Sequence, residues 1–130
     1  MTNYTKVKQF MATFGQEVKP VPKIAKLSTI TLRLALIEEE LQELREALVN
    51  NDIVETADAL ADILYVVYGA AAAFGIDIDE VFDEVHESNM SKLDEKGDPI
   101  YDDLGKVMKG ADYFHPNIAQ LMIKQGAVSV

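Results

Sequence analysis

Acidic side chains recur at helical spacing in two neighbouring stretches of this chain, and their types could support metal chemistry. In the first stretch Glu40 and Glu43 stand three residues apart, and in the second Asp58 and Asp62 stand four apart. Both spacings place the two carboxylates on one face of an α-helix. Carboxylate oxygens are the ligands that hard divalent cations such as Mg²⁺ prefer. If the two helices pack antiparallel, the four acids predict a magnesium site.

The plainer interpretation of these acids is a solvated helix face. Acid-rich helices commonly have such a face, and the cluster from Glu38 to Glu46 fits that description when it is taken alone. Asp58 and Asp62 fit it less well, because aspartate is a poor residue for a helix interior and the surrounding stretch is apolar. For Glu55, a place in the site and a place in a helix cap stay equally open.

Composition limits the classes of function. The chain has 130 residues, 48% of them hydrophobic, so we expect one domain over residues 1–130 with an ample core. The absence of cysteine excludes disulfides, thiol nucleophiles and thiolate zinc sites. The net charge of −10 argues against a nucleic-acid partner, because this surface repels a phosphate backbone. A phosphorylated small molecule would bind through cations.

The N-terminal stretch lacks the apolar centre of a signal peptide. No run of residues approaches the roughly 20 consecutive apolar positions that a membrane-spanning helix needs. We therefore expect no membrane partner and a cytoplasmic location.

Helical periodicity and stop signals predict an all-α, four-helix-bundle-like fold with a short terminal helix and a polar C-terminal loop. The proline-containing segment 16–26 reads as an extended connector, and the lysine-containing segment 91–116 reads as a loop. The expected helices are Tyr4–Phe14, a long helix from an N-cap at Ser28 to about Asn50, Asp52–Phe74, a helix from Asp77 or Asp79 to about Asn89, and Pro116–Gln125.

The two long helices have apolar residues on more than one face. One stripe of the first long helix is purely apolar and includes Leu34, Leu41 and Leu48. A second stripe carries Glu40 and Glu43 beside residues that usually pack, so it is not plainly a solvent face. Because one small bundle cannot bury all of these faces, we expect a homodimer or homotetramer.

At these residues the sequence resembles a known group of proteins. LIEEELQEL is similar to the EExxE signature, at Glu39, Glu40 and Glu43, of the all-α nucleoside triphosphate pyrophosphohydrolases. This group includes MazG-like enzymes, dimeric dUTPases and phosphoribosyl-ATP pyrophosphohydrolases. The segments ADILYVVYG, FGIDIDEVFDEVHESNMSKLD and GKVMKGADYFHP resemble the continuation in its MazG-like and dUTPase-like branch. The likeness extends from about Leu32 to Pro116.

The chain departs from the family pattern at one metal ligand. The family pairs EExxE with ExxD, and Asp62 matches that aspartate, but Ala59 stands where the glutamate is expected. The literal ExxD sequence lies one turn earlier, at Glu55–Asp58. We infer that Asp58 replaces the missing ligand, with Glu55 as the competing candidate.

The resemblance implies a MazG-type fold and hydrolysis of a (deoxy)nucleoside triphosphate to the monophosphate and pyrophosphate, with Mg²⁺, or Mn²⁺ in its place. The implied residues are catalytic Glu39, metal ligands Glu40, Glu43, Asp58, Asp62 and Glu55, and substrate contacts Asn89, Lys92, Lys106 and Lys109. The alternative is a non-catalytic helical module for oligomeric interactions. The sequence leaves the preferred nucleotide open, and it does not separate a house-cleaning role from control of nucleotide pools.

Overall fold

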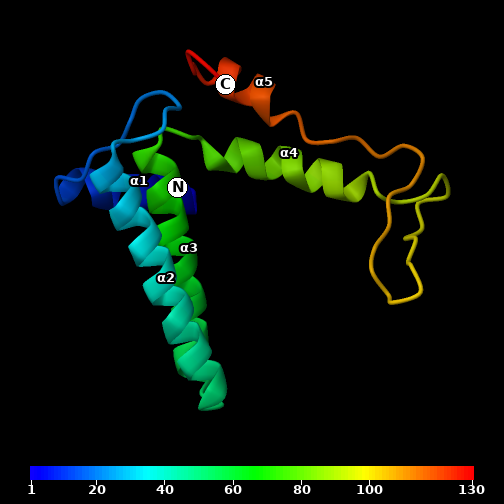
Figure 1. Cartoon of the computed structure of the whole chain (residues 1–130), viewed down its shortest axis with the longest axis horizontal. Coiled ribbons are helices and arrows are strands. Elements are labelled where there is room, and N and C mark those ends of the chain that lie inside the picture. Colours follow the sequence, from blue (N-terminus) through cyan, green and yellow to red (C-terminus); the bar gives the residue numbers. More distant parts are fainter.

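The chain is all-α in its computed structural model, which describes residues 1–130 (Figure 1). Only an isolated bridge between Tyr101 and Val107 pairs two extended segments. The predicted fold class and the order of the helices are confirmed. The helices are α1 (Asn3–Thr13), α2 (Leu27–Val49), α3 (Ile53–Ala73), α4 (Ile78–Met90) and α5 (Ile118–Lys124).

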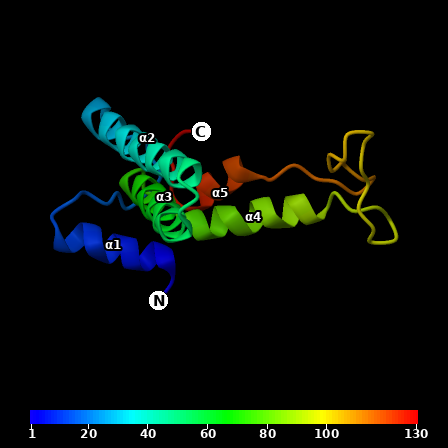
Figure 2. The same ribbon diagram turned by 90° about the horizontal axis from the view of Figure 1, so that it is seen from below.

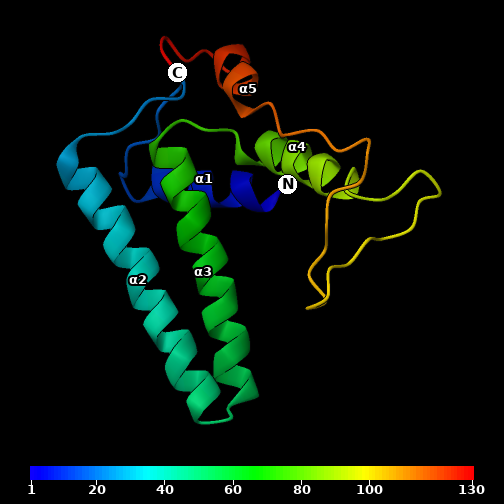
Figure 3. The same ribbon diagram turned by 45° about the vertical axis from the view of Figure 1, so that its right-hand side comes forward.

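The long helices α2 and α3 form an antiparallel hairpin (Figures 1 and 3). Residues 50–52 connect them, and Asn51 has a φ of 53°, a left-handed conformation that asparagine tolerates in turns. The Asp52 side chain accepts a hydrogen bond from the Glu55 backbone N–H at 3.0 Å. This bond caps α3 at the predicted residue and satisfies one of its free N–H groups. The short connection holds the two helices side by side.

The core lies where α1 packs against the C-terminal half of α3 (Figure 2). It joins Tyr4, Val7 and Met11 of α1 to the alanines at 71–73 of α3. Small side chains on α3 allow α1 to approach closely, and the Tyr4 and Tyr68 rings meet with centroids 6.3 Å apart. This packing brings α1 beside the α2–α3 hairpin.

Gly75 allows the connector between α1 and α2 to cross the end of α3. Its φ is +70°, and a Cβ atom there would overlap the backbone carbonyl of Val21. The connector is held by its Lys23 backbone N–H, which donates to the Phe74 carbonyl at 2.9 Å. Glycine therefore serves both as the predicted stop for α3 and as the space that the connector needs.

Helix α4 projects away from the hairpin, and residues 91–117 extend beyond it before the chain returns to α5 (Figures 1 and 3). We call residues 78–117 the arm. A hydrogen bond of 2.7 Å from Ser88 Oγ to the Phe114 carbonyl ties the two sides of the arm together. An ion pair of 3.2 Å between Lys124 and Glu80 joins α5 to α4. The packed part of the bundle within one chain is thus α1, α2 and α3.

Two predicted helix starts were wrong. Ser28 lies inside α2, whose N-cap position is Lys26, without a side-chain capping bond. Here the extended connector ends at Lys26 and the helix begins at the next residue. The path of the connector therefore decides where α2 starts, although Ser28 would be the better capping residue. Pro116 precedes α5, and Asn117 is its N-cap because the Asn117 side chain accepts from the Gln120 N–H at 3.3 Å.

Helix α3 is long and apolar enough to cross a membrane by length and composition alone. It also carries Glu55, Asp58 and Asp62, and it packs against both α1 and α2. These acids and contacts fit a core helix, so α3 does not indicate a membrane protein.

The outer faces of the hairpin leave large apolar side chains in solvent. On α2, Leu34 and Leu48 are 55% and 59% exposed. On α3, Ile53, Leu60 and Leu64 are also exposed. Leu34, Leu41 and Leu48 of the apolar stripe of α2 are therefore exposed, although Ile37 and Leu44 of that stripe are half-buried, and the acidic stripe faces α3.

Candidate metal and substrate site

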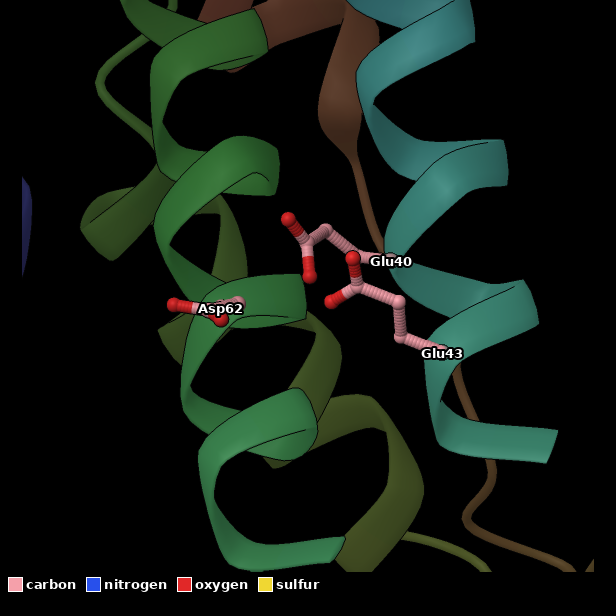
Figure 4. Close-up of side chains that lie close together, drawn as sticks. All are labelled: Glu40, Glu43 and Asp62. Atoms are coloured by element: carbon pink, nitrogen blue, oxygen red, sulfur yellow. The ribbon is translucent and has the colours of Figure 1, made fainter. Parts of the chain in front are cut away.

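Three of the predicted acids come together between α2 and α3. Glu40 and Glu43 extend from α2 toward α3, where Asp62 lies (Figure 4). One carboxylate oxygen from each of the three residues lies within 4.8 Å of the other two. We call Glu40, Glu43 and Asp62 the carboxylate cluster. The antiparallel hairpin creates the cluster, because it places the i and i+3 pair of one helix opposite the aspartate of the other.

Glu40 is the most constrained member of the cluster. Its Oε2 atom is buried and has no hydrogen-bond partner. Burial raises the pKa of Glu40 to about 7, with further contributions from a hydrogen bond and charge of Glu43 and from the charges of Asp62 and Glu39. A bound divalent cation would supply the missing partner and offset the repulsion. Three carboxylate oxygens, together with one buried oxygen that lacks a hydrogen-bond partner, therefore fit a hard cation.

A cavity of about 330 Å³ opens beside the cluster. Glu40 and Asp62 form one end, Arg33 and Gln16 are its other polar residues, and α1 closes one side with apolar and aromatic groups. This volume is at the lower end of the range of about 300–1,000 Å³ that is typical of small-molecule sites. The lining residues are Val7, Phe10, Met11, Gln16, Arg33, Leu36, Glu40, Asp62, Tyr65, Val66 and Gly69.

Asp58 and Glu55 lie next to the carboxylate cluster but are not part of the close set. Both are exposed, and with Glu43 they line a second cavity of about 380 Å³ nearer the hairpin tip. Asp58 stands one turn before Asp62 on α3. The structure thus brings Asp58 and Glu55 to a cavity that shares Glu43 with the cluster, and either side chain could turn toward a cation there.

The remaining predicted residues lie in two places. Glu39 is exposed on α2, beside the cluster in sequence. Asn89 and Lys92 lie at the end of α4 and just after it, within the arm. The arm extends away from the α2–α3 hairpin of the same chain (Figure 1), so the structure does not bring its residues to the cluster within one chain.

The arm lysines are held in place by local contacts, of which only that of Lys109 involves the ammonium group. The Lys109 ammonium lies 4.7 Å from the centroid of the Tyr113 ring. The Lys92 carbonyl accepts a backbone hydrogen bond from Gly110 at 2.9 Å, which places the chain around Lys92 next to the chain after Lys109. Lys106 lies between Asp102 and this segment in an exposed turn. Lys92, Lys106 and Lys109 therefore lie in the same outer part of the arm, among acidic residues of the same segment.

Sequence reasoning missed two polar residues of the cavity beside the carboxylate cluster. Arg33 is buried on α2, and Gln16 lies in the connector. The available signal was a lone arginine within an otherwise apolar helical segment, seven residues before Glu40 and therefore on the same face. Gln16 carried no signal, because only the path of the connector brings it to the cavity.

Comparison with known proteins identifies the family. Residues 7–89 match the family described as phosphoribosyl-ATP pyrophosphohydrolase. The matched range contains the second part of α1, all of α2 and α3 and nearly all of α4, and with them the whole carboxylate cluster. The chain belongs to this family. The predicted resemblance is therefore confirmed.

Two individual proteins are similar to this chain. A candidate NTP pyrophosphohydrolase from Exiguobacterium sp. 255-15, known from a crystal structure, matches with a TM-score of 0.52 and 26% sequence identity, covering 95% of this chain and 94% of its own. An uncharacterized protein of Acanthamoeba polyphaga mimivirus is 40% identical over 104 residues. That match covers 77% of this chain but only 39% of the viral protein, so the chain spans about two fifths of that relative's length.

Proposed function

We propose that this protein hydrolyses a (deoxy)nucleoside triphosphate to the monophosphate and pyrophosphate with the help of Mg²⁺. The carboxylate cluster carries this proposal, because it offers oxygen ligands, including a buried one without a partner, at one end of a cavity of about 330 Å³. The family match over residues 7–89 supports the same reaction class. Nucleoside triphosphates are abundant in the cytoplasm, where we place the reaction.

Glu40, Glu43 and Asp62 would hold the cation, with Asp58 as a further ligand and Glu55 as its competitor. A bound Mg²⁺, or Mn²⁺ in its place, would neutralise phosphate charge and polarise the bond to be broken. This neutralisation is needed because the net charge of −10 makes the protein repel a triphosphate. The protein's contribution is to keep the acids in place on two rigid helices.

Glu39 is our candidate for the residue that orients and deprotonates the attacking water. It points about 100° away from Glu40 around α2, so it lies beside the cluster. In the reaction one P–O–P bridge breaks, the water oxygen joins phosphorus, and the two products share the water's protons. An exposed carboxylate such as Glu39 can accept the first proton.

We also propose that a second copy of the chain completes the site. Exposed leucines and isoleucines along the hairpin need a cover, and a homodimer or homotetramer would provide one. The arm cannot reach the cluster of its own chain in this conformation, so Asn89, Lys92, Lys106 and Lys109 would contact the triphosphate bound to the other copy. The positive charges of the three lysines and the amide N–H groups of Asn89 suit phosphate oxygens.

The test is a titration of purified protein with Mg²⁺ and a panel of nucleoside triphosphates, followed by separate assays for pyrophosphate and orthophosphate. We expect pyrophosphate without orthophosphate from at least one substrate, and loss of activity by about 100-fold or more in Glu40→Gln and Asp62→Asn. Glu38→Gln, an exposed neighbour outside the cluster, is the matched control. Silence of the wild-type protein across the panel at millimolar metal would favour the non-catalytic interaction module instead.

A further inference from the structure

Arg33 is a buried cation without an anionic partner. Its side chain is on α2, the residue is only 7% exposed, and its single hydrogen bond in the chain runs from Nη2 to Gln16 Oε1 at 3.0 Å. Nε is buried and has no partner at all. Leaving the buried Nε donor of a guanidinium without an acceptor is costly unless a ligand supplies one. Because Arg33 lines the cavity beside the carboxylate cluster, a ligand in that cavity is in position to supply the missing acceptor.

The cavity has two polar ends, separated by two helical turns. Arg33 precedes Glu40 by seven residues on α2, and Gly69 follows Asp62 by seven on α3, so each pair is about 10 Å apart along its helix. The Nη1 atom of Arg33 lies only 2.7 Å from where a Cβ atom of residue 69 would stand. Gly69 therefore makes the space in which the guanidinium sits, at the level farthest from the acids.

The Arg33 end of the cavity offers donors in excess of acceptors. Arginine has no acceptor. The Gln16 amide oxygen is already used by Arg33, which leaves the Gln16 amide N–H groups as the free part of that side chain. The aromatic rings of Phe10 and Tyr65 line the same cavity and meet edge to face, with centroids 5.6 Å apart. A flat group with hydrogen-bond acceptors on its edge matches this combination.

We propose that Arg33 and Gln16 recognise the nucleobase of the substrate and select bases with an exocyclic oxygen over bases with an exocyclic amino group. The inference rests on the proposed triphosphate hydrolysis, which places the phosphates at the carboxylate cluster. A nucleotide carries its phosphates and its base on opposite sides of the sugar, and the two ends of the cavity are spaced accordingly. If a base presented its exocyclic amino group to Arg33 or Gln16, two hydrogen-bond donors would face each other and neither would have an acceptor.

The matched test compares pairs of substrates that differ at the exocyclic group and in the proton on the adjacent ring nitrogen: dITP with dATP, and dUTP with dCTP. In the wild-type protein we expect kcat/KM to be on the order of 10- to 100-fold higher for the oxo member of each pair, as for one hydrogen bond to a charged group. Arg33→Met should reduce this preference to within about threefold. A binding measurement free of metal should agree, with dUMP bound more tightly than dCMP by the wild type alone.

Two further variants separate recognition from folding. Gly69→Ala keeps the arginine but places a methyl group against Nη1, so it should weaken the preference for oxo bases. Because alanine favours a helix more than glycine does, this substitution should not weaken α3 itself. Arg45→Met changes the exposed arginine on the same helix and should leave the preference unchanged.

Three outcomes would overturn the inference: a wild-type preference for the amino members, an equal loss for both members of a pair in Arg33→Met, or equal affinity for dUMP and dCMP in the wild type. A wild-type protein that releases no pyrophosphate from any triphosphate but still distinguishes the two monophosphates would overturn the proposed hydrolysis and leave the base recognition standing.

Discussion

Glu40 is the residue at which burial and charge conflict most strongly in this protein. Its pKa of about 7 lies above the ordinary value of 4.5, so the metal-free folded protein binds this proton more tightly than the unfolded chain does. The stability that this proton provides is fully present below about pH 4.5 and is lost as the pH rises through about 7. A cation bound to the ionised carboxylate should reverse that loss.

We therefore predict that metal-free protein loses stability toward neutral pH and that Mg²⁺ stabilises it more at about pH 8 than at about pH 5. Urea unfolding followed by circular dichroism, in EDTA and in millimolar MgCl₂, measures both effects. Glu40→Gln should flatten the difference between the two pH values, and Glu38→Gln should keep it. An equal Mg²⁺ effect at both pH values would assign the stabilisation to another site.

Single substitutions can also decide which residue supplies the proposed fourth metal ligand. Asp58 and Glu55 line the same cavity with Glu43, and Asp58 is one turn from Asp62. We predict that Asp58→Asn weakens Mn²⁺ binding by roughly tenfold and that Glu55→Gln changes it little, because a lost carboxylate ligand removes both charge and a coordination bond. Titration calorimetry with Mn²⁺ gives both affinities. The reverse order would make Glu55 the ligand.

At the scale of the helices, the Asp52 cap shows how a local bond supports the site. We predict that Asp52→Ala lowers the free energy of unfolding by about 1 kcal/mol, because an N–H group of α3 loses its acceptor. Asp52→Asn keeps an acceptor and should stay within a few tenths of 1 kcal/mol of the wild type. Urea unfolding at one fixed protein concentration provides the comparison. Equal losses in both variants would show that the charge of Asp52, and not its hydrogen bond, matters.

Sequence periodicity predicted the helices well but could not assign their faces. The acidic cap at Asp52 and the glycine at 75 mark helix ends through local chemistry, so the structure agrees with them. The stripe with Leu34 and Leu48 looks like a core face, yet it is exposed, while the stripe with Glu40 packs toward α3. Which stripe packs within the chain depends on contacts between distant segments. The same limit hid Gln16, which reaches the cavity only through the connector.

At the scale of the whole molecule, the arm and the exposed hairpin faces share one explanation. The arm carries Lys92, Lys106 and Lys109 away from the carboxylate cluster of its own chain (Figure 3). The hairpin leaves large apolar side chains exposed. An assembly in which each arm reaches the cluster of another copy would use both features. Each site would then contain Glu40 from one copy and Lys92 from another.

This arrangement predicts that two inactive variants restore each other. Glu40→Gln and Lys92→Ala should each lower activity strongly, but in a mixed dimer one of the two sites receives both intact residues. After equal mixing and refolding together, about a quarter of all sites should be intact by random pairing in a symmetric dimer. Pyrophosphate release from the mixture, compared with each variant refolded alone, measures this. No gain in the mixture, with mixed dimers demonstrated by differently tagged chains, would mean that each site is built from one copy only.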